Sequence, residues 1–339
     1  MATGDSLPRA HGGAVISARF KLEPEDFEVE EIPGFEPSGN GEHAWLEVEK
    51  RGANTEWVAA RLAEFAGVPP SAVGFAGLKD RQALTRQAFT VQLPGQADPD
   101  WSALAVPGVR VLSATRHARK LKRGALRGNR FRIRLREITG DRDAVPARLE
   151  RIAAHGVPNY FGEQRFGRDG GNLELARALF AGRRLGRAQR GFALSAARAE
   201  IFNAAAAARV AEGSWDQPLD GEVWMLEGSH SVFGPEPWSE ALAGRLASGD
   251  IHPTGPMWGR GELRSEGAAR ALERDVAATH ADLAAGLEAA GLAQERRALR
   301  LPVGALDWAW EGDDMLLLAF ELGPGSFATA VLRELCEWS

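Results

Sequence analysis

Alternating apolar and polar residues near the start of the chain predict two short strands. The ranges Phe20 to Ile32 and Ala44 to Lys50 read as short extended segments, and the period of two that a half-buried strand requires is clearest at residues 27–30. A helix is expected next, from a cap at Asn54 or Thr55 to Gly67. Its apolar residues recur at helical spacing: Trp57, Val58, Leu62 and Phe65.

Further strand-like runs enclose a polar loop. Val73 to Ala76 leads into this loop and Ala88 to Leu93 leads out of it, so the loop is anchored at both ends. A longer strand is expected from Gly128 to Arg136, where polar and apolar residues alternate strictly. One face can therefore be buried while the other, with its arginines, is presented to phosphate groups. The first face carries Asn129, Phe131, Ile133 and Leu135.

Beyond Gly140 the spacing of apolar residues becomes helical. The expected helices, rich in Ala, Leu, Glu and Arg, are Leu173 to Leu185, Ala193 to Ala211, Trp238 to Ala247 and Arg264 to Arg300, the last broken by Gly286 and Gly291. Strand signals return at Ala305 to Trp310 and Met315 to Phe320, which residues 311–314 join as a hairpin. This order predicts an α+β protein. A mixed-sheet domain built from residues 1–154 and 304–339 is interrupted by a mainly helical module, residues 155–303.

Composition places the chain among ordinary globular proteins without metal sites. It has 339 residues, of which 44% are hydrophobic and 26% charged. No apolar run approaches the roughly 20 residues that span a bilayer, and the N-terminus lacks the features of a signal peptide, so we expect a cytoplasmic protein. The single cysteine, Cys336, excludes an internal disulfide and a multi-cysteine zinc site. The seven histidines show no metal-ligand spacing, and we expect no metal.

Positive charge is concentrated in one segment, although the net charge is −5. From Trp101 to Arg136 there is no Asp or Glu, and the rest of the chain is strongly acidic. Such a patch on an acidic protein is typical of a phosphate-binding surface, and the alternative is a solvated run of charge. Its bases are Arg110, Arg116, Arg119, Lys120, Lys122, Arg123, Arg127, Arg130, Arg132, Arg134 and Arg136.

The polar loop contains the most informative residue, Asp80. Three positive charges lie close to it in sequence, Lys79, Arg81 and Arg86, and nearby positive charge favours an ionised carboxylate at neutral pH. An ionised carboxylate suits a nucleophile or an electrostatic stabiliser better than a general acid. The alternative is that Asp80 caps a turn and pairs with Arg81 or Arg86.

The loop and four other segments, in the same order along the chain, resemble the motifs of the TruD family of tRNA pseudouridine synthases. They are residues 20–30, 74–91, 128–136, 159–167 and 322–334, and the resemblance runs from about Arg19 to Arg333. It implies a pseudouridine synthase catalytic fold with a family-specific inserted domain. It also implies isomerisation of uridine to pseudouridine in tRNA, at uridine 13 of the D arm.

The resemblance assigns roles to particular residues. Asp80 is the catalytic nucleophile, and Lys21 is a positive group oriented near its carboxylate. The target nucleotide is contacted by Phe27, Asn129, Phe131 and Phe327, while Arg130, Arg132 and Arg134 meet the RNA backbone. Simpler interpretations exist: a solvated lysine for Lys21, core packing for the phenylalanines and, at Phe327, a Gly-Pro-Gly turn followed by Ser326 as a helix cap. Asn129 is harder to dismiss, because a buried amide needs hydrogen-bond partners.

Isomerisation needs no external energy source and no redox partner, so we expect no cofactor. The chain also lacks a Gly-x-Gly-x-x-Gly motif that opens a helix and a phosphate-binding Gly-Lys-Ser/Thr loop. We expect a monomer that binds tRNA and no membrane. Two other hypotheses stay open: a non-catalytic RNA-binding protein, and a glycoside or nucleoside hydrolase, which would need a second carboxylate such as Glu28, Glu30 or Glu31.

Overall fold

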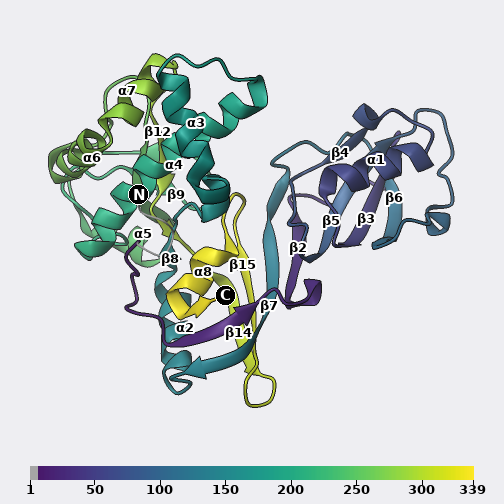
Figure 1. The fold of residues 1–339 in the computed structure, drawn as a ribbon, viewed down its shortest axis with the longest axis horizontal. Helices are drawn as coiled ribbons and strands as arrows, with labels where there is room; N and C mark the ends of the chain where they lie inside the picture. Colours follow the sequence, from purple (N-terminus) through teal and green to yellow (C-terminus); the bar gives the residue numbers. More distant parts are fainter. Residues whose placement is uncertain (1–6) are drawn as a thin grey trace. The chain divides into compact units, whose positions relative to one another are not determined.

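The structure, a computed structural model, describes residues 7–339, and its contacts divide them into two compact units (Figure 1). The sheet unit comprises Val15–Val145, Val303–Gly325 and Cys336–Ser339. The helical unit comprises the described residues up to Ala14 together with Pro146–Pro302 and Ser326–Leu335. Both units are thus discontinuous in sequence.

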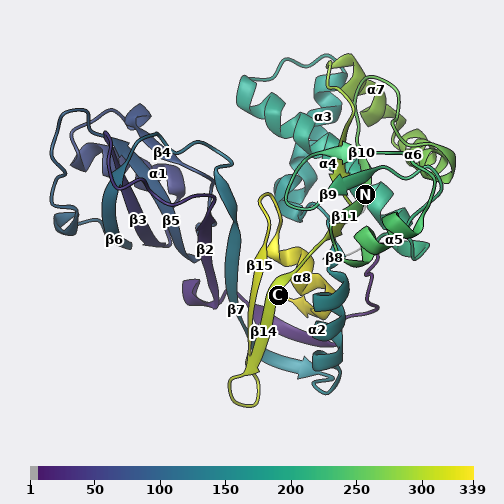
Figure 2. The same cartoon turned by 180° about the vertical axis from the view of Figure 1, so that it is seen from behind.

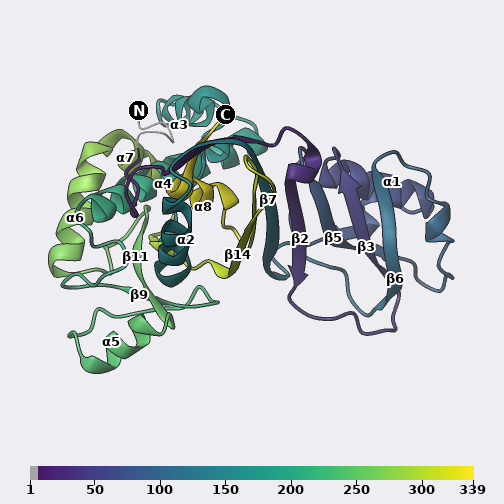
Figure 3. The ribbon, with the colours of Figure 1, turned by 90° about the horizontal axis from the view of Figure 1, so that it is seen from below.

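The sheet unit is built on a ten-stranded sheet whose main path runs β14-β15-β7-β2-β5-β3-β6. Figure 3 shows β2, β5, β3 and β6 side by side, and Figure 2 shows β14 and β15 as a yellow hairpin. Strands β2 and β5 are parallel, as are β1 and β16, and the other pairs are antiparallel. The strands are β1 (Ile16–Phe20), β2 (Phe27–Pro33), β3 (His43–Arg51), β4 (Val73–Phe75), β5 (Leu84–Gln92), β6 (Val109–His117), β7 (Leu126–Gly140), β14 (Gly304–Trp310), β15 (Leu316–Leu322) and β16 (Cys336–Trp338).

Helix α1 (Thr55–Phe65) covers one face of this sheet because its apolar residues meet alternate residues of the strands. Val58 and Leu62 are buried in one cluster with Leu46, Phe89 and Val91. The alternation expected for the long strand β7 is confirmed, since Phe131, Ile133 and Leu135 are buried while Arg130 and Arg132 are exposed. Burying a side chain of this size stabilises the fold by about 1.5–3 kcal/mol.

The helical unit contains seven helices among its described residues and two small sheets. The helices are α2 (Ala144–His155), α3 (Gly171–Phe180), α4 (Arg187–Ala211), α5 (Glu240–Ala247), α6 (Gly267–Thr279), α7 (Ala281–Ala289) and α8 (Ala328–Leu335). One sheet runs β10-β9-β11-β12 and the other pairs β13 with β8. Their strands are β8 (Val157–Pro158), β9 (Trp224–Leu226), β10 (Val232–Phe233), β11 (Ile251–Met257), β12 (Glu295–Ala298) and β13 (Arg300–Leu301). No helix among the described residues is long and apolar enough to cross a membrane.

The predicted helix from Arg264 to Arg300 is wrong at its C-terminal end. Helix α7 ends at Ala289, and residues 295–298 form β12, which pairs with β11. Glu, Arg and Ala favour helices locally, but pairing with a buried neighbouring strand overrides that weak preference. Strand β6, helix α2 and the four-stranded sheet were not predicted at all.

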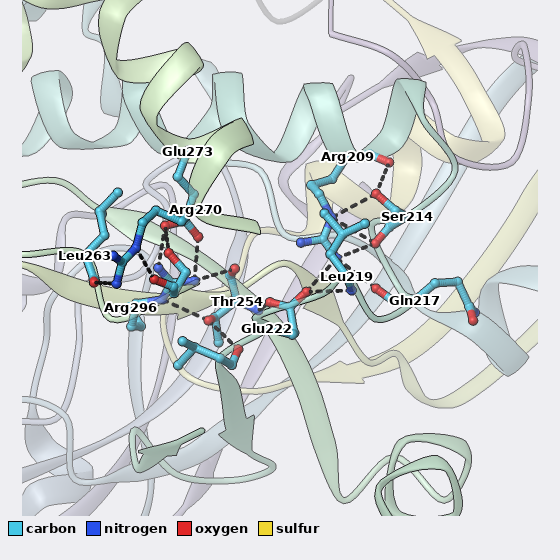
Figure 4. Close-up of polar contacts among 12 residues, drawn as sticks. Arg209, Ser214, Gln217, Leu219, Glu222, Thr254, Leu263, Arg270, Glu273 and Arg296 are labelled. Atoms are coloured by element: carbon cyan, nitrogen blue, oxygen red, sulfur yellow. Dashed lines mark hydrogen bonds and ion pairs between the residues drawn. The ribbon is translucent and has the colours of Figure 1, made fainter. Parts of the chain in front are cut away.

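Buried ion pairs hold the helical unit together where α4 meets the segment before β9 and where α6 meets β12 (Figure 4). Arg209 pairs with Glu222 at 2.8 Å, and Arg296 pairs with Glu273 at 2.7 Å. The second pair has further partners, because Arg296 Nε donates to Thr254 Oγ1 at 2.9 Å and Ser265 Oγ donates to Glu273 at 2.6 Å. A buried charge left without its partner is strongly destabilising.

We therefore expect Arg296→Met to lower the free energy of unfolding by about 3–5 kcal/mol, since it leaves Glu273 buried without a counter-charge. Urea denaturation measures this loss. Arg177→Met is the matched control, because Arg177 pairs with Asp282 on the surface, where such pairs contribute about 0–1 kcal/mol. Equal losses in the two variants would show that Glu273 does not depend on Arg296.

Candidate active site

Buried polar side chains fix the backbone of the loop between β4 and β5. The amide N–H of Lys79 donates to Thr55 Oγ1 at 3.0 Å. Gln87 Nε2 donates to the carbonyl oxygen of Gly77 at 3.2 Å, and Thr55 donates in turn to Gln87 at 3.0 Å. Thr55 and Gln87 are both buried, so these bonds lie in a region of low dielectric constant, where hydrogen bonds are strong.

Lys50 supplies a third attachment for the backbone of the loop. Its side chain is fully buried, and Nζ donates to the carbonyl oxygens of Ala53 at 2.8 Å and Asp80 at 3.0 Å. Burial lowers the pKa of Lys50 to about 8, despite the opposing charge of Asp80. The sequence analysis missed this residue. The signal was its position, because Lys50 follows Ala44, Leu46 and Val48 on the core face of β3.

The carboxylate of Asp80 is held by Lys21 and by its own loop. Lys21 Nζ lies 2.5 Å from Asp80 Oδ2, and the amide N–H of Gln82 donates to Oδ1 at 3.0 Å. Burial would raise the pKa of Asp80, but the hydrogen bond and charge of Lys21, the Gln82 N–H and the charge of Lys50 together lower it below its usual value. The Lys21 and Asp80 side chains keep 17% and 27% of their surface exposed, so an ionised carboxylate is accessible from solvent.

Lys21 reaches Asp80 through an unusual backbone conformation. The expected continuous strand from Phe20 to Ile32 is interrupted after β1, where Lys21 has a φ of 60°. That left-handed conformation is uncommon for a residue other than glycine and occurs preferentially at functional sites. The ammonium lies 4.1 Å from the ring centroid of Phe27, which adds a cation–π contact to the ion pair.

The bases that flank Asp80 in sequence do not supply its counter-charge, contrary to the sequence analysis. A short loop turns adjacent side chains in different directions, so neighbours in sequence need not be neighbours in space. Lys79 forms a buried pair with Glu31 at 2.5 Å, Arg86 pairs with Glu49 at 3.0 Å, and Arg81 Nε donates to the carbonyl oxygen of Gly52 at 3.4 Å.

Three phenylalanines stack beside Lys21 in the sheet unit. The ring centroids of Phe27 and Phe131 are 6.0 Å apart, and those of Phe131 and Phe320 are 5.5 Å apart. Phe27 and Phe131 are largely buried, so both contribute to the core of the sheet. Phe327 belongs to the helical unit, where it packs against a cluster that includes Tyr160 and Phe161.

Asn129 has a buried acceptor with no partner among the described residues. It lies on β7, between Glu31 on β2 and Leu322 on β15. Its Oδ1 atom is buried and accepts no hydrogen bond from the described residues. Since a buried acceptor without a donor is costly, this oxygen is suited to a ligand that brings an N–H group.

The arginine face of β7 is largely neutralised by acidic neighbours. Arg130 lies 2.8 Å from Glu321 and 3.5 Å from Glu30, and Arg134 lies 2.7 Å from Glu311. Arg132 is exposed, and no described carboxylate lies within ion-pair distance of it. Binding of the RNA backbone by Arg130, Arg132 and Arg134 stays a prediction, and two of the three would exchange a carboxylate for a phosphate.

More accessible positive charge lies in the connection between β6 and β7 and at the start of β7, where Arg127 lies. Arg119, Lys122 and Arg127 are exposed and form no ion pair with described residues. The connection is fixed beside β4, because the amide N–H of Gly124 donates to the carbonyl oxygen of Ala76 at 2.8 Å. This basic loop, residues 118–127, is therefore anchored to the strand that leads into the Asp80 loop.

The low pKa of Lys50 predicts a pH-dependent stability. With a folded pKa of about 8 and an unfolded pKa of about 10.4, the unfolded chain binds more protons between these values, so stability rises with pH across that window. Lys50→Met removes this contribution. Urea denaturation from pH 7 to 10.5 should show the wild type gaining up to about 3 kcal/mol relative to Lys50→Met. Parallel pH profiles would contradict the low pKa.

The whole chain is similar to one family of proteins. A family model described as tRNA pseudouridine synthase D (TruD) matches residues 10–183 and 174–335. The tRNA pseudouridine synthase D of Xanthomonas axonopodis pv. citri is 54% identical over 346 residues, covering 97% of this chain and 94% of the relative. The protein of the same name from Methylococcus capsulatus is 51% identical over 336 residues, covering 98% of this chain and 95% of the relative.

The fold is similar to a solved structure as well. A crystal structure of a tRNA pseudouridine synthase D (TruD) from Methanosarcina mazei has a TM-score of 0.76 with 21% identity, covering 96% of this chain and 95% of that chain. At this level of identity the likeness concerns the fold alone.

Proposed function

Because the chain belongs to the tRNA pseudouridine synthase D (TruD) family, we propose that it isomerises uridine to pseudouridine in tRNA with Asp80 as the nucleophile. By resemblance, the target is uridine 13 of the D arm. The observation that supports the role of Asp80 is its accessible carboxylate, kept ionised by Lys21 at 2.5 Å. We propose a cytoplasmic enzyme that works as a monomer without a cofactor.

The reaction breaks the bond between uracil N1 and the ribose, turns the base and joins uracil C5 to the same ribose carbon. No electrons are exchanged with another molecule, and the chain has to supply a nucleophile and a site that keeps the detached base. An anionic Asp80 meets the first need, whether it attacks the ribose or the base. Lys21 fixes Asp80 Oδ2, so the carboxylate is oriented before the substrate arrives.

The base must leave its stack to reach Asp80, and its recognition then depends on nearby polar and aromatic groups. Asn129 Oδ1 is a buried acceptor that receives no hydrogen bond from the described residues, and a uracil ring N–H can donate one. Phe27 and Phe131 border the same part of the sheet unit and provide apolar surface for the ring. We propose that Phe327 also contacts the substrate, as the family motif implies.

Asp80→Asn should abolish isomerisation and leave tRNA affinity within a few fold of the wild type, because it removes the nucleophile without adding repulsion. A loss of this kind is on the order of 10⁴-fold in rate. Reverse-transcription mapping of carbodiimide-treated tRNA, after incubation with purified protein, measures the product. Retention of a tenth of the wild-type rate would overturn the assignment.

Two triple variants compare the basic surfaces of the sheet unit at equal loss of charge. Each phosphate contact contributes about 0.7–0.9 to the log–log slope of affinity against salt. Changing Arg119, Lys122 and Arg127 to Gln should flatten the slope by about 2 to 3 units, since these bases form no internal pairs with described residues. The same change at Arg130, Arg132 and Arg134 should flatten it less, because Arg130 and Arg134 already have carboxylate partners. Fluorescence anisotropy with labelled tRNA provides the slopes, and a larger effect of the second variant would reverse this order.

A further inference from the structure

A second basic segment lies in the helical unit, where α3 leads into α4. Between Glu174 and Glu200 the sequence contains six arginines and no Asp or Glu. Two of the six are paired across the unit, Arg177 with Asp282 at 3.0 Å and Arg198 with Glu295 at 3.1 Å. The other four form no ion pair with any described residue: Arg183, Arg184, Arg187 and Arg190.

This segment projects beyond the core of the helical unit. From Ala181 to Phe192 every residue except Leu185 is exposed, and the buried face of α4 begins only at Ala193. Phe192 keeps 61% of its surface exposed, as much as any large apolar side chain in the described chain. The first turns of α4 therefore contribute little to packing, and core formation does not explain their composition.

The segment is also electrostatically costly. Arg187 and Arg190 are three residues apart on one helix, a spacing at which like charges repel. Arg183 and Arg184 precede them by a few residues, so four guanidinium groups share a short stretch of surface without a described carboxylate. An anionic partner outside the chain would relieve this repulsion.

The combination of several arginines and one exposed aromatic ring is suited to binding RNA. Guanidinium groups bind phosphate oxygens through two parallel hydrogen bonds, and an exposed ring stacks on an unpaired base. The carboxylates of a purely acidic protein surface would pair with the arginines, but such a surface would offer no partner for the exposed ring of Phe192.

We propose that residues 183–192 are a second RNA-binding surface, which holds backbone phosphates of tRNA through its four arginines and stacks an unpaired base on Phe192. This inference rests on the proposed function in that tRNA is the ligand. It adds a contact in the helical unit to the basic loop and the arginines of the sheet unit.

The test separates the two kinds of contact by their dependence on salt. The variant with Gln at all four arginines should bind tRNA with a log–log slope smaller by about 2 to 4 units. Phe192→Ala should weaken binding on the order of 10-fold at every salt concentration with an unchanged slope, because stacking releases no ions. Phe192→Trp should restore the affinity.

A matched pair of double variants controls for net charge. Arg187→Gln with Arg190→Gln should flatten the slope by about 1 to 2 units. Arg177→Gln with Arg245→Gln removes the same charge from the helical unit, but those side chains pair with Asp282 and Asp250, so the slope should stay unchanged. Circular dichroism and thermal melting check that each variant is folded.

The outcomes distinguish this inference from the proposed function. Unchanged tRNA affinity and slope in the variant with all four arginines replaced would overturn the second surface, even if the wild type isomerises uridine. Equal flattening by both double variants would also overturn it, because the effect would then reflect net charge alone. A wild type that binds tRNA with the expected slopes but forms no pseudouridine would refute the proposed function and leave the second surface standing.

Discussion

The ion pair between Lys21 and Asp80 is the interaction around which the candidate active site is organised. It joins the turn after β1 to the loop after β4, two segments that do not pair as strands. Each partner is fixed by different means. Lys21 is set by its left-handed backbone and by the ring of Phe27, whereas the backbone on the Asp80 side is held by Lys50, Thr55 and Gln87. The carboxylate is thus oriented by several buried polar groups, each of which would be costly to leave unpaired.

Sequence reasoning worked where one periodic signal decided the outcome. The strict alternation in β7 predicted which residues are buried, and the apolar spacing before Gly67 predicted α1. It failed where a segment distant in sequence determined the secondary structure. The residues of β12 favour a helix locally, but they form a strand because they pair with β11. The same reason explains the mistaken counter-ions of Asp80. Proximity along the chain suggested Lys79, which the fold instead pairs with Glu31 on a neighbouring strand.

Charge counted along one strand also omits what the neighbouring strands carry. Arg130 lies opposite Glu30 on β2 and Glu321 on β15, and it pairs with both. A run without acidic residues is therefore not a positively charged surface until its strand partners are known. In loops and at projecting helix ends there are no strand partners, and the sequence alone is the better guide. Phe327 shows another limit of sequence reasoning. The family motif implies that this residue contacts the substrate, but the motif carries no information on where its side chain lies relative to Asp80.

The pairing order of the sheet has a consequence for synthesis on the ribosome. Strand β7 emerges early, whereas β15, which pairs along Asn129 to Leu135, follows only after the whole of Pro146–Pro302. At roughly 5–20 residues per second, one edge of β7 stays without its neighbour for on the order of 10 seconds or more. During that time the nascent chain exposes a long, half-apolar strand edge, which is a template for wrong pairing. The ion pairs of Arg130 with Glu321 and of Arg134 with Glu311 are also missing then, and positive charge along such an edge discourages association with another copy.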